Sequence, residues 1–408
     1  EIDHGRVVRE INRKKNFFRL NKTCPTCRGV RFQFLGSIEN QKRAQLFFFP
    51  YLAWNNYDKT QIGIMLYNSF LPTQKFNYLL VPAIGTASRQ FIGFGRVGYS
   101  FFPDKGMQRL EVGLAAKRFD YILFPKPLLM QKLEPFIHID FKKKDLRSPD
   151  NHSLHMRSVI AFLGWVDFNK NKGTQRYYVN EIKYQYERQT TLNPLRITAT
   201  MQQGNQFMNL QLEAKFLISY KRKNEGLHIR VFAGGFPLYF KPATDINAPL
   251  PKMYLSMATT NSFAYWLQKD YMLDENFVDR NGRDKYVGRQ VALSGGAFRS
   301  ITTFGATNKF LAAINLSTTT HRFFPIYPFV NGAVIVNELN KVEVAAEMGL
   351  SLAIVHDMLE LHLPLVTTNN IRDNEKLNGI NKWYQKFTFT FKVDLPRPIK
   401  LVQKLAGR

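Results

Sequence analysis

The chain has 408 residues, of which 45% are hydrophobic and 14% aromatic, and its mean hydropathy is −0.27. It contains no window of 18 uncharged apolar residues, which excludes a bundle of transmembrane helices. The 57 Lys and Arg residues outnumber the 31 Asp and Glu residues, for a net charge of +26. These basic residues form no single cluster with the aromatic residues, so we expect no nucleic-acid partner. The excess indicates solubilising loops and a basic side that faces anionic lipid or an acidic partner, or else a lumen that attracts anions.

Residues 1–27 are polar and basic without the alternation of a strand, and we expect them to form a linker or lead-in. The sequence opens on Glu1 without a signal peptide, so it starts at a mature end or continues a longer chain. Cys24 and Cys27, the two cysteines, predict a short-loop disulfide in an oxidising compartment. Half of a zinc ribbon and a thioredoxin-like redox pair are the alternatives, but no second pair and no strand–turn–helix context support them.

The most regular segment, residues 109–117, alternates polar and apolar residues strictly. Because successive side chains of a strand point to opposite faces, this segment predicts a strand with one polar face and one apolar face. The same rhythm recurs in residues 209–220, where only Leu217 breaks it. A chain that repeats this pattern is expected to form a closed antiparallel barrel. Its apolar face turns inward in a soluble barrel and outward in a membrane.

Strand length and aromatic residues favour the membrane. Many candidate strands have ten or more residues, enough to cross a bilayer at a tilt, and rings gather near strand ends, as in residues 99–102 and 323–327. We therefore predict an all-β fold, a transmembrane antiparallel β-barrel. The expected lumen-facing residues are Arg109, Glu111, Lys117, Glu181, Lys183, Glu213 and Lys215. The expected lipid-facing residues are Leu110, Val112, Leu114, Leu212, Phe216 and Phe389.

Turn residues divide the chain into about 16 strands, with a range of 14 to 18. We expect residues 28–398 to form the barrel and residues 399–408 to form a tail. The stretch 237–286 holds four prolines and then a charged segment, which predicts a long surface loop with one strand near 252–268. The other candidate strands, which bring the total above the expected number, lie near residues 29–39, 43–54, 60–70, 75–86, 92–102, 107–119, 133–143, 153–168, 174–189, 193–203, 206–221, 225–234, 286–303, 307–319, 323–337, 341–354, 357–367 and 382–395.

Two strings look like catalytic motifs but lack the context that those motifs need. His356 and His362 are six residues apart. On a strand they would be separated by about 20 Å, so they cannot bind one zinc ion as His-Glu-x-x-His does on a helix. The string from Gly93 to Gly98 reads Gly-x-Gly-x-x-Gly, but a strand follows it rather than the helix that receives a pyrophosphate. We therefore predict no catalytic residues, no cofactor and no metal site.

A longer pattern covers residues 46–103. A Pro-x-x-x-Trp-Asn-x-Tyr-Asp segment is followed by Gly, Asn, Leu-Pro, Lys-Phe, Pro, Gly and Ser at fixed spacing, and similar stretches recur at residues 295–299, 311–316 and 361–365. The pattern resembles the C-terminal region of bacteroidete outer-membrane proteins whose N-terminal part is a zinc aminopeptidase of the membrane alanyl aminopeptidase (gluzincin) family. The matching residues are Pro50, Trp54, Asn55, Tyr57, Asp58, Gly63, Asn68, Leu71, Pro72, Lys75, Phe76, Pro82, Gly85 and Ser88, whereas Ile84 stands in place of a Tyr.

The resemblance implies a barrel in the bacterial outer membrane. It carries over no catalytic residue, because the family's His-Glu-x-x-His motif is absent from this sequence. The expected role is a membrane anchor or assembly component for a peptidase-like domain or for outer-membrane or periplasmic partner proteins, surrounded by outer-membrane lipids. The alternative is a channel that passes peptides or anionic solutes through a basic lumen. An even strand number would put both ends of the barrel on the periplasmic side.

The two faces of residues 109–117 can be tested locally. Arg in place of Val112 is expected to destabilise the barrel by about 2–4 kcal/mol, because the charge would enter hydrocarbon. Lys in place of Glu111 is expected to cost far less, since it would stay in a hydrated interior.

Overall fold

The computed structural model describes residues 30–35, 44–55, 58–68, 75–103, 105–122, 128–145, 147–166, 172–204, 207–220, 225–239, 254–258, 289–291, 293–319, 325–355 and 359–391. The expected Cys24–Cys27 disulfide, the lead-in, the tail and His356 lie outside these residues. Most of the expected loop over residues 237–286 does too. Within the described residues, no helix is both long and apolar enough to cross a membrane.

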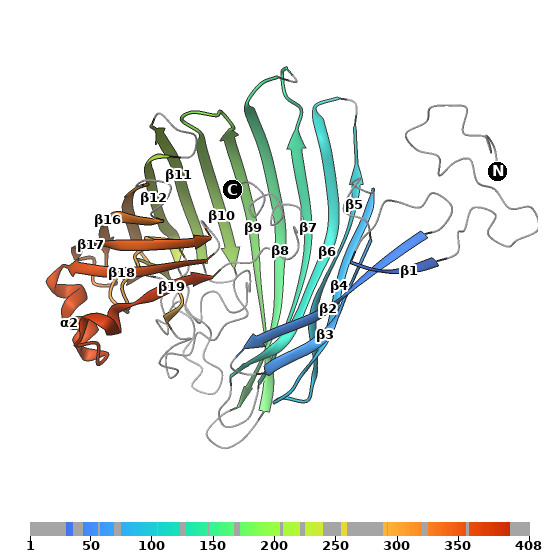
Figure 1. Ribbon diagram of the computed structural model, residues 1–408, viewed down its shortest axis with the longest axis horizontal. Helices are drawn as coiled ribbons and strands as arrows, with labels where there is room; N and C mark the ends of the chain where they lie inside the picture. The colour runs from blue at the N-terminus through green and yellow to red at the C-terminus, as the bar shows by residue number, and fades with distance from the viewer. Residues whose placement is uncertain are drawn as a thin grey trace, which may run out of the picture.

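Seventeen strands form one large sheet that curves around an interior (Figure 1). They are β1 (Val30–Phe34), β2 (Ala44–Asn55), β3 (Lys59–Tyr67), β4 (Phe76–Gly85), β5 (Phe91–Phe101), β6 (Met107–Ile122), β7 (Leu128–Phe141), β8 (Asp150–Val166), β9 (Lys172–Arg188), β10 (Leu195–Gly204), β11 (Phe207–Ser219), β12 (Gly226–Tyr239), β15 (Phe310–Thr318), β16 (Ile326–Val336), β17 (Val342–Val355), β18 (Leu359–Thr367) and β19 (Thr388–Phe391). Two short strands, β13 (Leu255–Ser256) and β14 (Ala306–Thr307), pair with each other in a second sheet. The helices α2 (Asn369–Leu377) and η3 (Trp383–Lys386) lie between β18 and β19.

The large sheet is a meander. Each strand from β2 to β12 pairs antiparallel with the next, and the strands from β15 to β19 do the same. β12 pairs with β15 across the long connection between them, and β1 adds to β2 in parallel. Without β1, sixteen strands remain in the antiparallel meander. The predicted β-barrel is therefore confirmed, and the 17 strands of its sheet among the described residues lie within the predicted range of 14 to 18.

Three predicted strands differ from the structure. The stretch expected near 286–303 is not a strand of the sheet over its described residues, because it turns at Gly295 and packs inside the barrel. The strand expected near 252–268 shrinks to β13 among its described residues, and the one expected near 382–395 begins only at Thr388, after η3. Residues 237–239 belong to β12 rather than to the loop.

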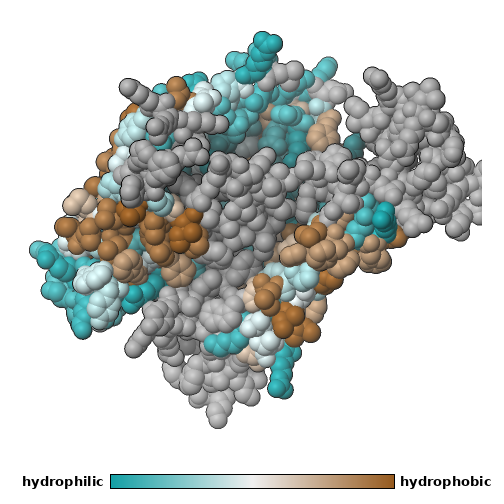
Figure 2. Space-filling view, in the orientation of Figure 1, coloured by the Kyte–Doolittle hydropathy of each residue, from teal (hydrophilic) through white to brown (hydrophobic). Residues whose placement is uncertain are grey.

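The alternation of the sequence separates two faces of the sheet. Along β6, Glu111 is 3% exposed, whereas Val112 and Leu114 on the opposite face are 43% and 39% exposed. Figure 2 shows hydrophobic residues gathered over β16–β18 and over β2–β3. Such an extended exposed apolar face is the lipid-facing surface of a transmembrane barrel. Further apolar side chains exposed on these strands include Leu52, Ile62, Ile84, Ile182, Leu210, Val231, Ile314, Val330, Val344 and Met348.

The opposite face of the sheet carries two apolar clusters in addition to polar residues. One cluster covers β2 to β5 and consists of Phe47, Tyr51, Tyr67, Leu79, Val81, Ala83 and Ile92. The other joins the wall to the connection between β12 and β15, and it positions the site described next.

Candidate functional site

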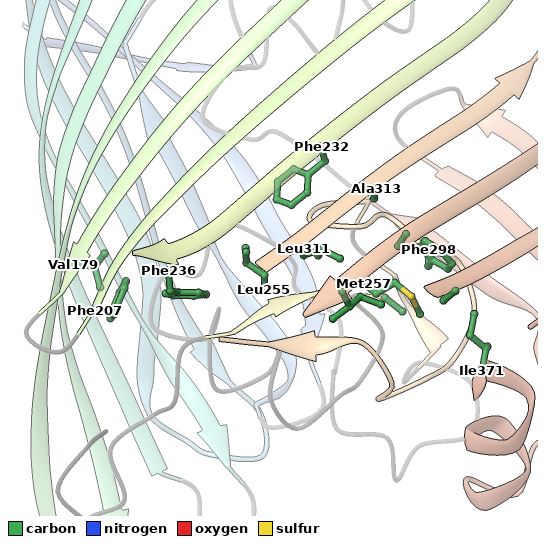
Figure 3. Packing of buried hydrophobic residues seen from close by; sticks show 14 of the residues in the cluster. Val179, Phe207, Phe232, Phe236, Leu255, Met257, Phe298, Leu311, Ala313 and Ile371 are labelled. Atoms are coloured by element: carbon green, nitrogen blue, oxygen red, sulfur yellow. The ribbon is translucent and has the colours of Figure 1, made fainter. Parts of the chain in front are cut away.

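Part of the connection between β12 and β15 packs against the inner face of the barrel wall. We call its described residues 254–258, 289–291 and 293–305 the inserted segment. Met257 and Phe298 of this segment are fully buried and belong to one cluster with Leu311 of β15 and Ile335 of β16 (Figure 3). Burial of large apolar side chains contributes about 1.5–3 kcal/mol each, so this contact fixes the segment inside the barrel.

Two glycines allow the inserted segment to fold back on itself. Gly295 has a φ of +59°, and a Cβ at Gly296 would lie 2.6 Å from the carbonyl oxygen of Met257. The backbone N–H of Gly296 donates to the Ser256 carbonyl at 3.0 Å, and that of Phe298 donates to the Met257 carbonyl at 3.1 Å. This close approach needs residues without a side chain, and it directs Phe298 and Arg299 toward the wall.

A carboxylate of the wall holds the turn in place. Glu347 of β17 accepts hydrogen bonds from the backbone N–H of Arg299 at 2.6 Å and of Ser300 at 2.9 Å. The Ser300 hydroxyl also donates to this carboxylate, and the Asn331 side chain donates to it at 2.6 Å. Glu347 is 2% exposed, so a buried charge is matched by four donors.

The neighbouring Arg299 is also buried in the wall. Its guanidinium carbon lies 4.1 Å from the centre of the Phe329 ring, a cation–π contact. Desolvation lowers the pKa of the Arg299 guanidinium, and nearby Tyr327, Glu347 and Glu360 oppose this shift. Its backbone carbonyl accepts a hydrogen bond from the Thr388 hydroxyl of β19 at 2.8 Å. Arg299 therefore contacts both β16 and the last strand, β19.

A chain of hydrogen bonds continues from Glu347 across four neighbouring strands. Asn315 of β15 donates to the Asn331 side chain at 3.0 Å and to the Gly296 carbonyl at 2.9 Å. Arg230 of β12 donates to Asn315 at 2.7 Å and to Glu213 of β11 at 2.7 Å. The inserted segment is thus part of one polar network with β11, β12, β15, β16 and β17.

The inserted segment is also hydrogen-bonded to β19 and to α2. His362 of β18 is fully buried and hydrogen-bonds Ser351 at 2.8 Å and Thr390 at 3.0 Å. The Thr390 hydroxyl donates to the Val291 carbonyl at 3.1 Å, and the Val291 N–H donates to the Phe389 carbonyl at 2.8 Å. From α2, Asn374 accepts from the Thr302 hydroxyl at 2.9 Å.

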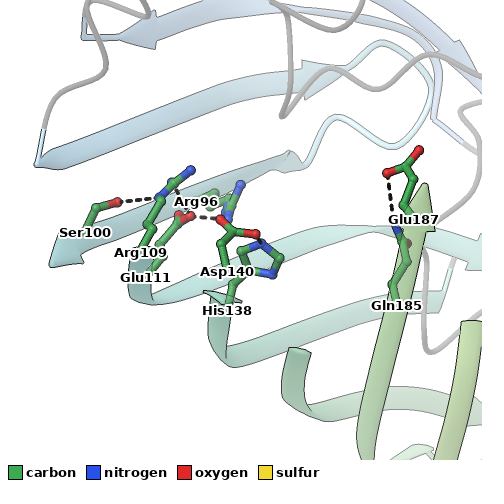
Figure 4. A network of polar contacts seen from close by, with 8 residues as sticks. All are labelled: Arg96, Ser100, Arg109, Glu111, His138, Asp140, Gln185 and Glu187. Atoms are coloured by element: carbon green, nitrogen blue, oxygen red, sulfur yellow. Dashed lines mark hydrogen bonds and ion pairs between the residues drawn. The ribbon is translucent and has the colours of Figure 1, made fainter. Parts of the chain in front are cut away.

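A second polar region lies on the inner face of β5 to β9. Glu111 forms ion pairs with Arg96 at 2.9 Å and with Arg109 at 2.5 Å, and Arg109 also donates to Ser100 (Figure 4). Further along, Arg157 pairs with Glu181 at 2.8 Å. We call this region the charged wall, and its charges of opposite sign lie against each other.

The structure places the sequence-predicted residues in both regions. Of the expected lumen-facing residues, Glu111 and Glu181 are buried, Glu213 pairs with Lys215 at 3.1 Å, and Lys117 and Lys183 are half-buried. Of the expected lipid-facing residues, Leu212 is 53% exposed and Phe216 is 37% exposed. Leu110 and Phe389 are half-buried.

The surroundings of Glu111 change one expectation. Lys in place of Glu111 would meet two arginines in a nearly buried position instead of open water. Three adjacent cations with low exposure repel each other strongly. We therefore expect this substitution to be costly, and a neutral Gln becomes the milder change at this position.

The contacts of the inserted segment were missed by the sequence reasoning. The sequence of β17 does contain a hint of these contacts, because Glu347 shares one face of the strand with the small residues Ala345, Gly349 and Ser351. Small residues around a single carboxylate leave room for another part of the chain and offer it an acceptor. Arg299 stands in a stretch that the sequence pattern singled out, but nothing in the pattern identifies its partner.

The arrangement holds the inserted segment in place as a structural lock. Among the described residues, no group of three or more His, Cys, Asp or Glu side chains is placed to hold a metal ion. The His362 pair with Ser351 is enclosed by protein, since these residues are 0% and 1% exposed, and so it has no access for a substrate. Its hydrogen bonds and packing contacts fix the inserted segment inside the barrel.

No family model and no curated protein matches the sequence. Among solved structures, the chain is similar to BamA from Haemophilus ducreyi lacking POTRA domains 1–3, with 9% identity, a TM-score of 0.44, and coverage of 85% of this chain and 70% of that chain. It is also similar to CdiB from Acinetobacter baumannii, with 8% identity, a TM-score of 0.39, and coverage of 86% and 62%. The assignment to the transmembrane β-barrels rests on the strands and faces described above.

Proposed function

We propose that the chain is an integral barrel of the bacterial outer membrane that acts as a membrane anchor or assembly component for a peptidase-like domain or for partner proteins. One observation carries this proposal: the inserted segment is locked inside the barrel by Glu347, Arg299 and the residues around them. A lumen that is occupied in this way suits a holding role better than the passage of solutes.

The location in the outer membrane is supported by the fold. A membrane without water in its core admits only structures that satisfy all backbone hydrogen bonds internally, namely helices and closed barrels. Bacterial barrels of this type have even strand numbers, which place the first and the last strand's free ends on the same, periplasmic side. The sixteen-strand antiparallel meander agrees with that arrangement.

The alternative function is a channel for peptides or anionic solutes, which the net charge of +26 favours. Against it, cations of the charged wall are matched by carboxylates, as in the contacts of Glu111 with Arg96 and Arg109. Paired charges contribute little net field to a passing anion. The channel is therefore the second proposal.

A peptidase-like partner is supported by the sequence resemblance alone. We expect the isolated 408-residue chain to leave aminoacyl-naphthylamides intact. The reading frame around the gene tests the association, because a His-Glu-x-x-His domain encoded in the same frame would identify this barrel as its anchor. Hydrolysis by the isolated chain would contradict the assignment of the chemistry to another domain.

Membrane extraction and conductance test the main proposal. We expect carbonate and high salt to leave the chain in the membrane fraction, and detergent to release it. In planar bilayers we expect little conductance from the wild type and more from Arg299→Ala, which loosens the lock. Arg289→Ala is the matched control, because Arg289 belongs to the same segment but donates, within the described part of the chain, to the exposed Tyr384 carbonyl at 3.4 Å. Release by carbonate alone, or a large steady conductance of the wild type, would overturn the proposal.

A further inference from the structure

Three parts of the chain meet at the end of the barrel where β2 is connected to β3. Asp58 stands in that turn, and Ser88 stands in the turn between β4 and β5. Asp120 lies near the end of β6. Because the strands alternate in direction, the end of β2, the end of β4 and the end of β6 all lie on this side of the sheet. Residues far apart in sequence are thereby brought together.

The contacts between the two turns are tight. The Ser88 hydroxyl donates to the Asp58 carboxylate at 2.7 Å, and the Ala87 N–H donates to the Asp58 carbonyl at 3.0 Å. A Cβ at Gly85 would lie 2.5 Å from the Ser88 hydroxyl oxygen and 2.8 Å from an Asp58 carboxylate oxygen. Asp58, Gly85 and Ser88 are all positions of the pattern in residues 46–103, so that pattern encodes this meeting point.

Asp120 brings a second carboxylate to the same place. Asp58, Ser88 and Arg118 lie close enough to the Asp120 carboxylate to interact with it. Asp58 and Asp120 are each 0% exposed. Both carboxylate oxygens of Asp120 are buried without a hydrogen-bond partner, and the Nε of Arg118 likewise has none.

We propose that Asp58, Asp120 and the Ser88 hydroxyl bind a hard divalent cation, Ca²⁺ or Mg²⁺, which ties the two turns to the end of β6. Such cations take oxygen ligands, and the three side chains offer only oxygen. Sites with one or two carboxylates complete their coordination with water or backbone carbonyls. This site is independent of the lock around Arg299.

A shared proton is the competing way to relieve two adjacent buried carboxylates. One proton satisfies one oxygen–oxygen contact, whereas the Asp120 carboxylate has two oxygens without a donor. The single proton of the Ser88 hydroxyl is already donated to Asp58. A cation, by contrast, binds oxygens of both carboxylates together with the Ser88 oxygen, and it therefore accounts for more of the buried acceptors.

Terbium luminescence tests the site directly. The full chain is refolded in a zwitterionic detergent free of lipopolysaccharide, stripped with EDTA, and titrated with Tb³⁺ under excitation of tyrosine. Tyr51 is 6% exposed and lies close enough to Asp58 to feel its charge, so it serves as the sensitiser. We expect one saturable signal that Ca²⁺ or Mg²⁺ displaces. Asp120→Asn is expected to weaken binding by at least about tenfold, as loss of a metal ligand does.

The matched control is Asp140→Asn, because Asp140 is another strand carboxylate but pairs with His138 at 3.1 Å. It should bind Tb³⁺ like the wild type. If Asp120→Asn does not fold, Ser88→Ala removes one ligand and keeps both carboxylates, and it should also weaken binding. Absence of a saturable signal in the wild type overturns the proposal. So does equal binding by the wild type and the folded variants, and so does stabilisation by Asp120→Asn without any cation, which identifies a shared proton.

Discussion

Two regions of the same barrel wall use their inner faces differently. On the charged wall, long side chains pair with one another, and Arg96 and Arg109 keep 24% and 29% of their side chains exposed. On β17, the inner face instead carries Ala345, Gly349 and Ser351 around Glu347, and the inserted segment donates two backbone hydrogen bonds to Glu347. The difference teaches that an alternating strand determines which face is inside, while side-chain size determines whether that face meets water or another part of the chain.

The energetic consequence follows from burial. Ion pairs that remain partly exposed contribute little, typically 0–1 kcal/mol, because water screens them. A carboxylate that is 2% exposed and bonded to backbone N–H groups is costly to remove, because those donors lose their acceptor. Substitutions in the two regions should therefore differ in size.

The largest effect is expected from Glu347→Ala. It removes the acceptor of the N–H groups of Arg299 and Ser300 and a negative charge close to the buried Arg299, so the free energy of unfolding should fall by about 3–5 kcal/mol. Urea unfolding in lipid vesicles, followed by tryptophan fluorescence, measures it. Glu343→Gln on the same strand is the control, because Glu343 lies near the strand end and accepts a hydrogen bond from the Asn337 side chain at 2.8 Å. A loss as small as that of the control would show that the lock is not stabilising.

Val112→Arg tests the outer face. The new charge would enter the hydrocarbon region, with an expected cost of about 2–4 kcal/mol near the midplane. Val112→Leu, which keeps the face apolar, should change stability little. Should the chain fold without any detergent or lipid and still be destroyed by Val112→Arg, Val112 would lie in a soluble core and the membrane assignment would fail.

A smaller effect is expected from Glu111→Gln on the charged wall. The change keeps the shape but removes the negative charge that Arg96 and Arg109 share, at a cost of about 1–3 kcal/mol. The same unfolding experiment measures it, and the loss should shrink as salt is added, because salt screens the repulsion between the two arginines. A salt-independent loss would indicate a packing defect instead.

The smallest effect is expected from Lys215→Ala. Lys215 pairs with Glu213 but keeps 46% of its side chain exposed, and Glu213 retains Arg230 at 2.5 Å. Stability should fall by less than about 1 kcal/mol. A loss as large as that of Glu347→Ala would contradict the rule that an ion pair exposed to water contributes little.

The wall was predictable from the sequence because period-two alternation is a local property. The one break in the alternation of β11 also has a structural explanation. Leu217 lies on the polar face but is buried there, with 8% exposure. The inserted segment was mistaken for a strand, because its partner Glu347 is 48 residues from Arg299 and no local rule connects them. The meeting of Asp58 with Ser88 was hidden for the same reason, since they are 30 residues apart and come together only through strand pairing.

These sequence separations also set an order of assembly. Most pairs of neighbouring strands are hairpins that close over short loops, so they can form early. The bonds of the inserted segment span 48 residues at Arg299–Glu347, 89 at Arg299–Thr388 and 99 at Val291–Thr390. Because long loops are entropically costly to close, and because the bonding partners on β17 and β19 are in place only after these strands have formed, the segment docks after the wall that receives it. Filling of the lumen is therefore the last step of folding. In native-state hydrogen exchange, the amides of the inserted segment should exchange at lower opening free energy than those of the hairpins.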